Sequence, residues 1–189
     1  MGEKLFDRTS IIAIATIVVA ATVMLAIQGR VVWCEAGDYS PWSWTVMSRH
    51  NSQHIIDAYS FTHILHGILE FWLIGLVFYK LPLAWRFVIA IFIESTWETL
   101  ENTSYIINRY REATLSLDYF GDSITNSLAD IVCCGIGFVI AKKIGYWWSL
   151  ALFIVTETIL IFTIRDSLIL NIIMLIYPLD AIKGWQTGM

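Results

Sequence analysis

The chain has 189 residues, of which 57% are hydrophobic and 15% are charged, and its formal net charge is -4. Because an average soluble domain carries roughly 25% charged residues, so few charges could not cover a soluble protein of this size. The composition predicts an integral membrane protein, and the lack of a basic stripe or run argues against nucleic-acid binding.

Six apolar segments follow one another along the chain. Five approach the roughly 20 residues that cross a bilayer, at about 11–29, 60–81, 85–102, 123–144 and 147–164. The sixth, 167–180, is shorter and contains Pro178. A segment of this length is compatible with a short tilted crossing, a re-entrant hairpin or an interfacial helix. Of these, we expect a crossing. The predicted fold class is therefore all-α, a polytopic transmembrane bundle of about six helices in a single domain over residues 1–189.

Two polar stretches interrupt these segments. Residues 30–58 interleave charged side chains with Trp33, Trp42 and Trp44. Indole rings favour the headgroup region, so this stretch is expected to lie on the membrane surface. Residues 103–121 are typical of a short amphipathic helix at the same surface.

The first apolar run and the placement of lysine and arginine predict the orientation. The run from Ile11 to Ile27 is longer than the roughly 7–15 residues of a signal-peptide core, which predicts an uncleaved first helix. A cytoplasmic N-terminus and six crossings place all five lysines inside, with Lys4, Arg8, Lys80, Arg86, Lys142, Lys143 and Lys183 as the inner set. The outer set is Arg30, Arg49, Arg109, Arg111 and Arg165. This bias predicts a multi-pass membrane protein whose N-terminus is cytoplasmic, with membrane lipids as its partners.

Ionisable residues recur at similar depth near the outer ends of three of the segments. They are His63 and His66 at i, i+3, then Glu94, Glu98 and Glu101 at i, i+4, i+7, and then Asp122, Asn126 and Asp130. Each set forms one stripe on its helix. Since such groups in lipid face the bundle interior or a wet cavity, the stripes predict a shared polar cavity that opens to the outer face.

Imidazoles and carboxylates are the ligands of zinc, iron and manganese, and without metal they act as general acids and bases. The candidate catalytic residues are His63, His66, Glu98, Glu101, Asp122 and Asp130. Of these, His63, His66 and Glu98 are the expected ligands of a divalent metal. The candidate substrate-binding residues are Asn51, His54, Asn102, Arg109, Arg111, Asn126 and Arg165. The guanidinium groups of the three arginines match the geometry of a phosphate group.

Structural interpretations stand beside these. The histidines could hydrogen-bond between helices, and Glu98 and Glu101 could form an ion-pair network with Arg109 and Arg111. Asp122 follows a glycine and could cap the next helix. Glu157 is expected to be a neutral or paired carboxyl.

No CxxC pair is present, and Cys133 and Cys134 are expected to be small packing residues, whereas Cys34 lies in a polar loop.

Three long strings carry a family resemblance: NSQHIIDAYSFTHILHG, WETLENTSYIINRYREATLSLDYFGDSITNSLAD and IRDSLILNIIMLIYPLDAIKGWQ. They resemble a bacterial inner-membrane family of the UPF class, with the domain of unknown function 2585, over about residues 29–186. The resemblance implies no reaction. Two departures are Ala36, where the family has the second cysteine of a CxC pair, and Glu70, where it has an aromatic or apolar residue. More distantly, the order of His, Glu and Asp on successive helices is similar to VanZ-like membrane proteins.

The leading functional hypothesis is an enzyme, a metal-assisted hydrolase or transferase that acts on a lipid-linked or envelope substrate. One alternative is a proton-coupled transporter that uses Glu94, Asp130 and Glu157 as a relay. Another is a non-catalytic assembly protein whose polar network only holds helices together. The sequence has no GxxxxGK[ST] loop, which argues against an ATP-driven pump, and no GxSxG or HExxH motif.

Overall fold

Helices make up most of the chain in the computed structural model, which describes residues 4–113 and 119–188. Within these residues the helices are α1 (Arg8–Ile27), α2 (Ser60–Val77), α3 (Leu83–Glu101), α4 (Ser104–Ala113), α5 (Ile124–Ile164), α6 (Leu168–Ile176) and α7 (Asp180–Thr187). Two short strands, β1 (Trp42–Ser43) and β2 (Ile56–Asp57), pair in parallel, with Trp42 opposite Ile56. The predicted all-α class is confirmed.

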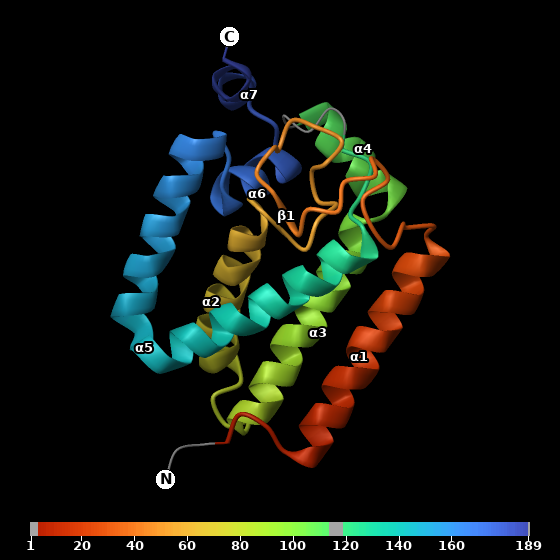
Figure 1. The fold of residues 1–189 in the computed structure, drawn as a ribbon. Helices are drawn as coiled ribbons and strands as arrows, with labels where there is room; N and C mark the ends of the chain where they lie inside the picture. Colours follow the sequence, from red (N-terminus) through yellow and green to blue (C-terminus); the bar gives the residue numbers. More distant parts are fainter. Residues whose placement is uncertain (1–3, 114–118, 189) are drawn as a thin grey trace.

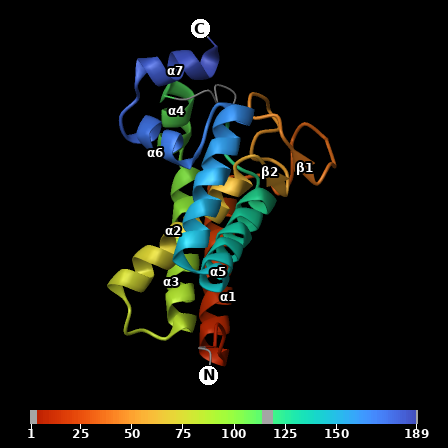
Figure 2. The ribbon, with the colours of Figure 1, turned by 90° about the vertical axis from the view of Figure 1, so that its left-hand side faces the viewer.

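The long helices lie side by side, and the short elements gather at one end of them (Figure 1). Helices α4, α6 and α7 and the loop that carries β1 and β2 all lie at the upper end, with the C-terminus. The N-terminus lies at the lower end, with the connection between α2 and α3, and a view turned by 90° shows the same division (Figure 2). The polar stretches of the sequence are therefore brought together at one end of the bundle.

Helix α5 consists of two arms that meet at Gly145. This residue has φ 77° and ψ 175°, a region of backbone conformation that is essentially restricted to glycine. The arms diverge from this point, so that α5 turns back toward the upper end (Figure 1). The turn falls between the predicted segments 123–144 and 147–164, each of which corresponds to one arm.

Three helices are long and apolar enough to cross a membrane: α1, α2 and α5, with mean hydropathies of 2.6, 1.4 and 1.8. Helix α3 has a similar length but carries Arg86, Glu94, Glu98 and Glu101. Many large side chains of the long helices are exposed, for example Val19 at 62%, Leu76 at 75% and Phe162 at 82%. Apolar side chains on the outside of long helices suit a lipid surrounding.

The expected sixth crossing over 167–180 is not confirmed. Helix α6 has nine residues, a length of about 14 Å at the usual rise, against roughly 30 Å for the hydrocarbon core. Lys183 in α7 donates from Nζ to the carbonyl oxygen of Glu112 in α4 at 2.6 Å. Lys183 therefore lies at the same end as Arg109 and Arg111, and its expected place on the opposite side is wrong.

The amphipathic helix predicted over 103–121 is shorter, because α4 covers Ser104–Ala113 and residues 119–121 are not helical; residues 114–118 lie outside the described part of the chain. Glu157 is paired as expected, because its carboxylate accepts from the backbone N–H groups of Leu168 at 2.8 Å and Ile169 at 3.2 Å. These are orphan donors at the first turn of α6, so Glu157 of α5 fixes where α6 begins.

Candidate functional site

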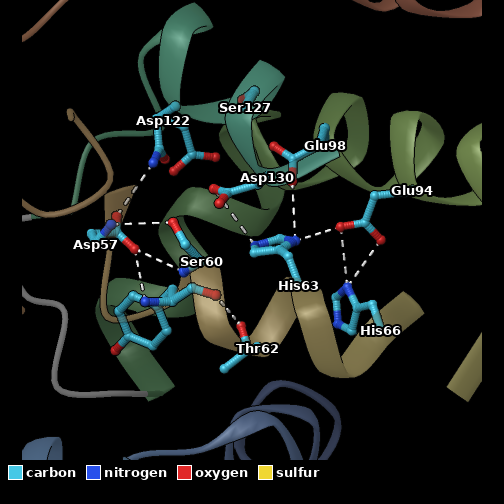
Figure 3. A network of polar contacts seen from close by, with 12 residues as sticks. Asp57, Ser60, Thr62, His63, His66, Glu94, Glu98, Asp122, Ser127 and Asp130 are labelled. Carbon is cyan, nitrogen blue, oxygen red and sulfur yellow. Dashed lines mark hydrogen bonds and ion pairs between the residues drawn. The ribbon is translucent and has the colours of Figure 1, made fainter. Parts of the chain in front are cut away.

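Two histidines of α2 share one carboxylate of α3 (Figure 3). His63 Nδ1 contacts Glu94 Oε1, and His66 Nδ1 lies 3.0 Å from Glu94 Oε2. The i, i+3 spacing of the histidines places both rings on the face of α2 that meets α3. Glu94 is 1% exposed, so the two imidazoles stabilise a carboxylate that water does not reach.

Carboxylates surround His63 on both edges of its ring. Glu98 Oε1 lies 3.4 Å from Nδ1, and Asp130 Oδ2 of α5 lies 3.8 Å from Nε2 (Figure 3). Among the described residues, neither oxygen of Glu98 accepts a hydrogen bond, and Oδ1 of Asp130 also has none. Helices α2, α3 and α5 thus bring together a buried cluster in which acceptor oxygens outnumber their donors.

A cavity of about 60 Å³ lies against this cluster. Its polar side is formed by Asn51, Ser52, Thr62, His63, His66, Glu101, Asp122, Asp130 and Asn171. Helix α6 forms its apolar wall with Leu168, Ile172 and Leu175. The other lining residues are aromatic: Tyr59, Trp97, Tyr110 and Tyr119. The cavity is therefore amphipathic.

Asp122 lies in the cavity wall just before α5. Its Oδ1 accepts from the Tyr119 hydroxyl at 2.9 Å, and its Oδ2 accepts from Asn102 Nδ2 at 2.7 Å. Burial raises the pKa of this carboxyl to about 6, although the two hydrogen bonds oppose the rise. Ser123, not Asp122, caps α5, because its side chain accepts from the Asn126 N–H at 3.1 Å. The interpretation of Asp122 as the cap is wrong.

Two tyrosines near the cavity remain hydrogen-bond donors at neutral pH. Burial raises the pKa of Tyr110 well above its usual value, and the negative charge of Glu101 adds to the rise. Burial does the same to the pKa of Tyr119, where Asp122 supplies the charge. Another buried acid, Asp57, accepts from the N–H groups of Tyr59 at 2.7 Å and Ser60 at 3.0 Å, and so stabilises the start of α2.

The structure places the sequence-predicted site residues in three positions. His63, His66, Glu101, Asp122, Asp130 and Asn51 line the cavity, and Glu98 lies behind His63. Asn102, Asn126 and His54 are buried beside it: Asn102 binds Asp122, and Asn126 Nδ2 donates to the His54 carbonyl at 2.8 Å. Their contacts connect α3, the loop before α2 and the start of α5.

The three arginines do not line the cavity. Arg109 donates to the Leu175 carbonyl at 2.9 Å, Arg111 to that of Tyr119, and Arg165 to that of Trp185 at 3.3 Å. Among the described residues, neither Arg109 nor Arg111 pairs with Glu98 or Glu101, so the alternative ion-pair network is not found. The arginines instead connect backbone segments at the upper end, and substrate binding by them stays a prediction.

The sequence placed Glu94 in the polar stripe of its helix but not among the catalytic residues, and it did not identify the cavity residues Trp97, Tyr110 and Tyr119. Glu94 precedes Glu98 by four residues on the same stripe, and this spacing was the signal for it. The tyrosines come from α4 and the segment before α5, and a helical period does not reveal which of their side chains turn inward.

Two sets of side chains that share His63 lie close enough together to hold a metal ion. The ligand atoms of His63, His66 and Glu94 lie within 4.8 Å of one another, and so do those of His63, Glu98 and Glu101. The expected set of His63, His66 and Glu98 therefore divides between them, with His63 in both.

Fold and site together define a helical protein with apolar long helices and a buried histidine–carboxylate cluster at one end. The chain belongs to the family described as "Protein of unknown function (DUF2585)", whose model matches residues 25–188. This match confirms the resemblance found in the sequence, whereas the similarity to VanZ-like proteins is not shown.

Curated relatives cover most of the chain. A UPF0314 protein of Brucella anthropi is 44% identical over 180 residues, 95% of this chain and 91% of the relative. A UPF0314 protein of Paracoccus denitrificans is 42% identical over 92% of this chain and 90% of its own. A third, of Sinorhizobium fredii, is 46% identical over 86% and 83%. No solved structure matches the chain.

Proposed function

We propose that the protein is a membrane enzyme that carries out metal-assisted hydrolysis or group transfer on a lipid-linked or envelope substrate. The observation that carries this proposal is the cluster at the cavity, where ligand atoms of His63, His66 and Glu94 lie within 4.8 Å of one another. Three helices hold these and the neighbouring acids on a packed scaffold, which is the preorganisation that catalysis requires.

A divalent cation fits the charge of the cluster. Glu94, Glu98 and Asp130 are all buried, and three of their oxygen atoms accept no hydrogen bond. Buried carboxylates require protons, cationic partners or a metal, because an isolated buried charge is costly. Imidazole and carboxylate donors suit zinc, iron or manganese. Bound there, such an ion would supply Lewis-acid polarisation of a phosphate or ester oxygen.

The cavity walls indicate the class of substrate. Helix α6 contributes Leu168, Ile172 and Leu175 on one side, and the other side carries His66, Asp122 and Asp130. A molecule with an apolar tail and a polar head satisfies both sides at once. This is the reason to favour a lipid-linked substrate over a free polar metabolite.

Asp122 is suited to proton transfer at the cavity. Its pKa is about 6, so it changes its protonation near neutral pH, and it lies in the cavity wall. The Tyr119 hydroxyl stays protonated and donates to Asp122 Oδ1 at 2.9 Å, so it holds this carboxyl in position. The transport alternative requires Glu157 as a relay, but its carboxylate is engaged by the first turn of α6.

Metal binding at the cavity is tested with Mn²⁺, because carboxylates are good ligands for this ion and thiolates are poor ones. Purified, metal-stripped protein in lipid nanodiscs is titrated while electron paramagnetic resonance follows free Mn²⁺. We expect one bound ion, and at least roughly tenfold weaker binding in Glu94→Gln and His66→Gln, because each removes a ligand. Asp180→Asn, an exposed carboxylate of α7 away from the cavity, is the control and should bind as the wild type does.

Activity is tested in vesicles of bacterial polar lipids that contain a polyprenyl diphosphate, with release of inorganic phosphate as the readout. We expect release that depends on Mn²⁺ and is lost in His66→Gln but kept in Asp180→Asn. Wild-type protein that binds no Mn²⁺, or His66→Gln protein that binds it equally well, would overturn the proposal.

A further inference from the structure

A second cluster of ligand side chains lies in the loop before α2, apart from the cavity. Cys34 Sγ is 3.5 Å from His50 Nδ1, and His50 Nδ1 is 3.3 Å from His54 Nε2. All three atoms lie within 4.8 Å of one another. Cys34 is 6% exposed and His54 is fully buried, and none of the three residues lines the cavity. Cys34 is distant in sequence from the histidines, so the loop folds back to assemble the cluster.

A backbone contact sets the tautomer of His54. Its Nδ1 lies 2.7 Å from the carbonyl oxygen of Ser40. A carbonyl only accepts, so Nδ1 carries the proton, and in the neutral ring Nε2 presents its lone pair to Cys34 and His50. Ligating histidines are oriented in this way, with the second ring nitrogen donating to a carbonyl.

Hydrogen bonds alone do not satisfy the three atoms. If His50 Nδ1 carries a proton and donates to His54 Nε2, it cannot also accept the thiol proton of Cys34. If it accepts from Cys34, two nitrogen lone pairs face each other across 3.3 Å. A shared cation removes the conflict, because all three atoms then act as ligands.

The spacing matches a tetrahedral ion. Metal–sulfur and metal–nitrogen bonds of about 2.3 and 2.0 Å at tetrahedral angles separate sulfur from nitrogen by about 3.5 Å and two nitrogens by about 3.3 Å. These values equal the two separations measured from His50 Nδ1, 3.5 Å to Cys34 Sγ and 3.3 Å to His54 Nε2, and the third pair of ligand atoms lies within 4.8 Å. We propose that Cys34, His50 and His54 bind a zinc-class ion through a thiolate and two imidazoles. Asp38, whose Oδ2 lies 4.0 Å from His50 Nδ1, is the nearby carboxylate for the fourth position.

The ion would hold one wall of the cavity in place. The residues between the two histidines are Asn51, Ser52 and Gln53, all buried, and the first two line the cavity. Ser52 has φ 57°, a left-handed conformation that a serine keeps only when its surroundings enforce it. Gln53 Nε2 donates to the Gly121 carbonyl at 2.7 Å, so this short stretch also contacts the segment before α5. The role inferred for the metal is therefore structural.

Co²⁺ is the probe, because cobalt bound to a thiolate gives a sulfur-to-metal charge-transfer band in the near ultraviolet. Metal-stripped, reduced protein in nanodiscs is titrated with Co²⁺ and then with Zn²⁺. We expect one equivalent of the band, its displacement by Zn²⁺, and a loss of Co²⁺ affinity of more than about 100-fold in Cys34→Ser and in His50→Gln. Because Mn²⁺ binding at the cavity is measured separately, failure of one proposal leaves the other standing.

Matched controls use the same types of residue elsewhere. Cys133→Ser removes a thiol of α5, and His66→Gln removes a histidine of the cavity, and both should keep the band. Thermal unfolding of each variant shows whether it folds, and Zn²⁺ should raise the midpoint of the wild type more than that of His50→Gln, which keeps only the cavity cluster. Folded wild-type protein without the band, or a band that persists in Cys34→Ser, would overturn the site.

Discussion

Asp122 is the cavity acid whose titration can be followed most directly. Its pKa is about 6 in the folded protein and close to 3.8 in an unfolded chain, so the folded state holds the proton more tightly. The contribution of Asp122 to the free energy of unfolding is therefore largest below pH 4 and falls as the pH rises to about 6. The fall is at most about 3 kcal/mol, for two pKa units. In Asp122→Asn, we expect this part of the pH dependence to disappear.

The measurement is the free energy of unfolding in detergent at several pH values between about 4 and 7. Asp180→Asn, at an exposed position in α7, is the control and should keep the wild-type pH dependence. If Asp122→Asn and the wild type lose the same stability over this range, another group is responsible.

At the residue scale, the sequence predicted the members of the cluster better than their partners. The stripes of His63, His66, Glu98 and Asp130 follow from helical periods, and the structure brings these residues together (Figure 3). Glu94 was assigned to the relay of the transport alternative because it lies deeper in its helix. Which carboxylate meets an imidazole depends on the register between α2 and α3, and a single helical pattern does not contain that register.

Helices α2 and α5 cross so closely that glycine is required at their contact. A Cβ on Gly67 would overlap the Cys134 carbonyl oxygen, and one on Gly137 would overlap that of Ile64. Small residues let helices of membrane proteins approach in this way. Since Gly67 follows His66 directly, the crossing also sets the distance between the histidines and Asp130 of α5.

We expect Gly67→Ala and Gly137→Ala to destabilise the protein by roughly 3 kcal/mol, because the backbones must move apart. Gly75→Ala is the matched control in the same helix, since a Cβ there meets nothing within 4 Å. It should be neutral or stabilising, by up to about 1 kcal/mol, from helix propensity. Thermal or denaturant unfolding in detergent measures all three. Equal effects at Gly67 and Gly75 would contradict the close crossing.

At the element scale, hydropathy predicted where the long helices lie, and it also predicted the interruption near Gly145. It also predicted where the shorter sixth segment begins, but not that α6 ends at Ile176. Tyr177 is extended, with φ -141° and ψ 91°, as expected of the residue before a proline. At the other end, Glu157 accepts from the Leu168 N–H, and a hydropathy profile does not contain this tertiary contact.

The number of passes of the whole molecule decides on which side the cavity opens. Helices α1, α2 and α3 and the two arms of α5 make five passes between the ends, and the termini lie at opposite ends (Figures 1 and 2). With Lys183 at the upper end, the 12 Lys and Arg residues divide equally between the ends. The charge bias used in the sequence prediction therefore no longer fixes the orientation, and a direct measurement is needed.

We expect the N-terminus in the cytoplasm and, after five passes, the C-terminus and the cavity on the outer side. Alkaline phosphatase fused after Met189 should then be active in a bacterial host, because its disulfides form only outside the cytoplasm. A fluorescent protein fused there should stay dark, and the same protein fused before Met1 should fluoresce. Six passes with the same N-terminus reverse the results at the C-terminus alone, whereas an inverted five-pass protein reverses them at both ends. Fluorescence at the C-terminus together with fluorescence at the N-terminus would restore the sixth crossing. Fluorescence at the C-terminus with a dark N-terminal fusion would exclude the proposed outward-facing cavity.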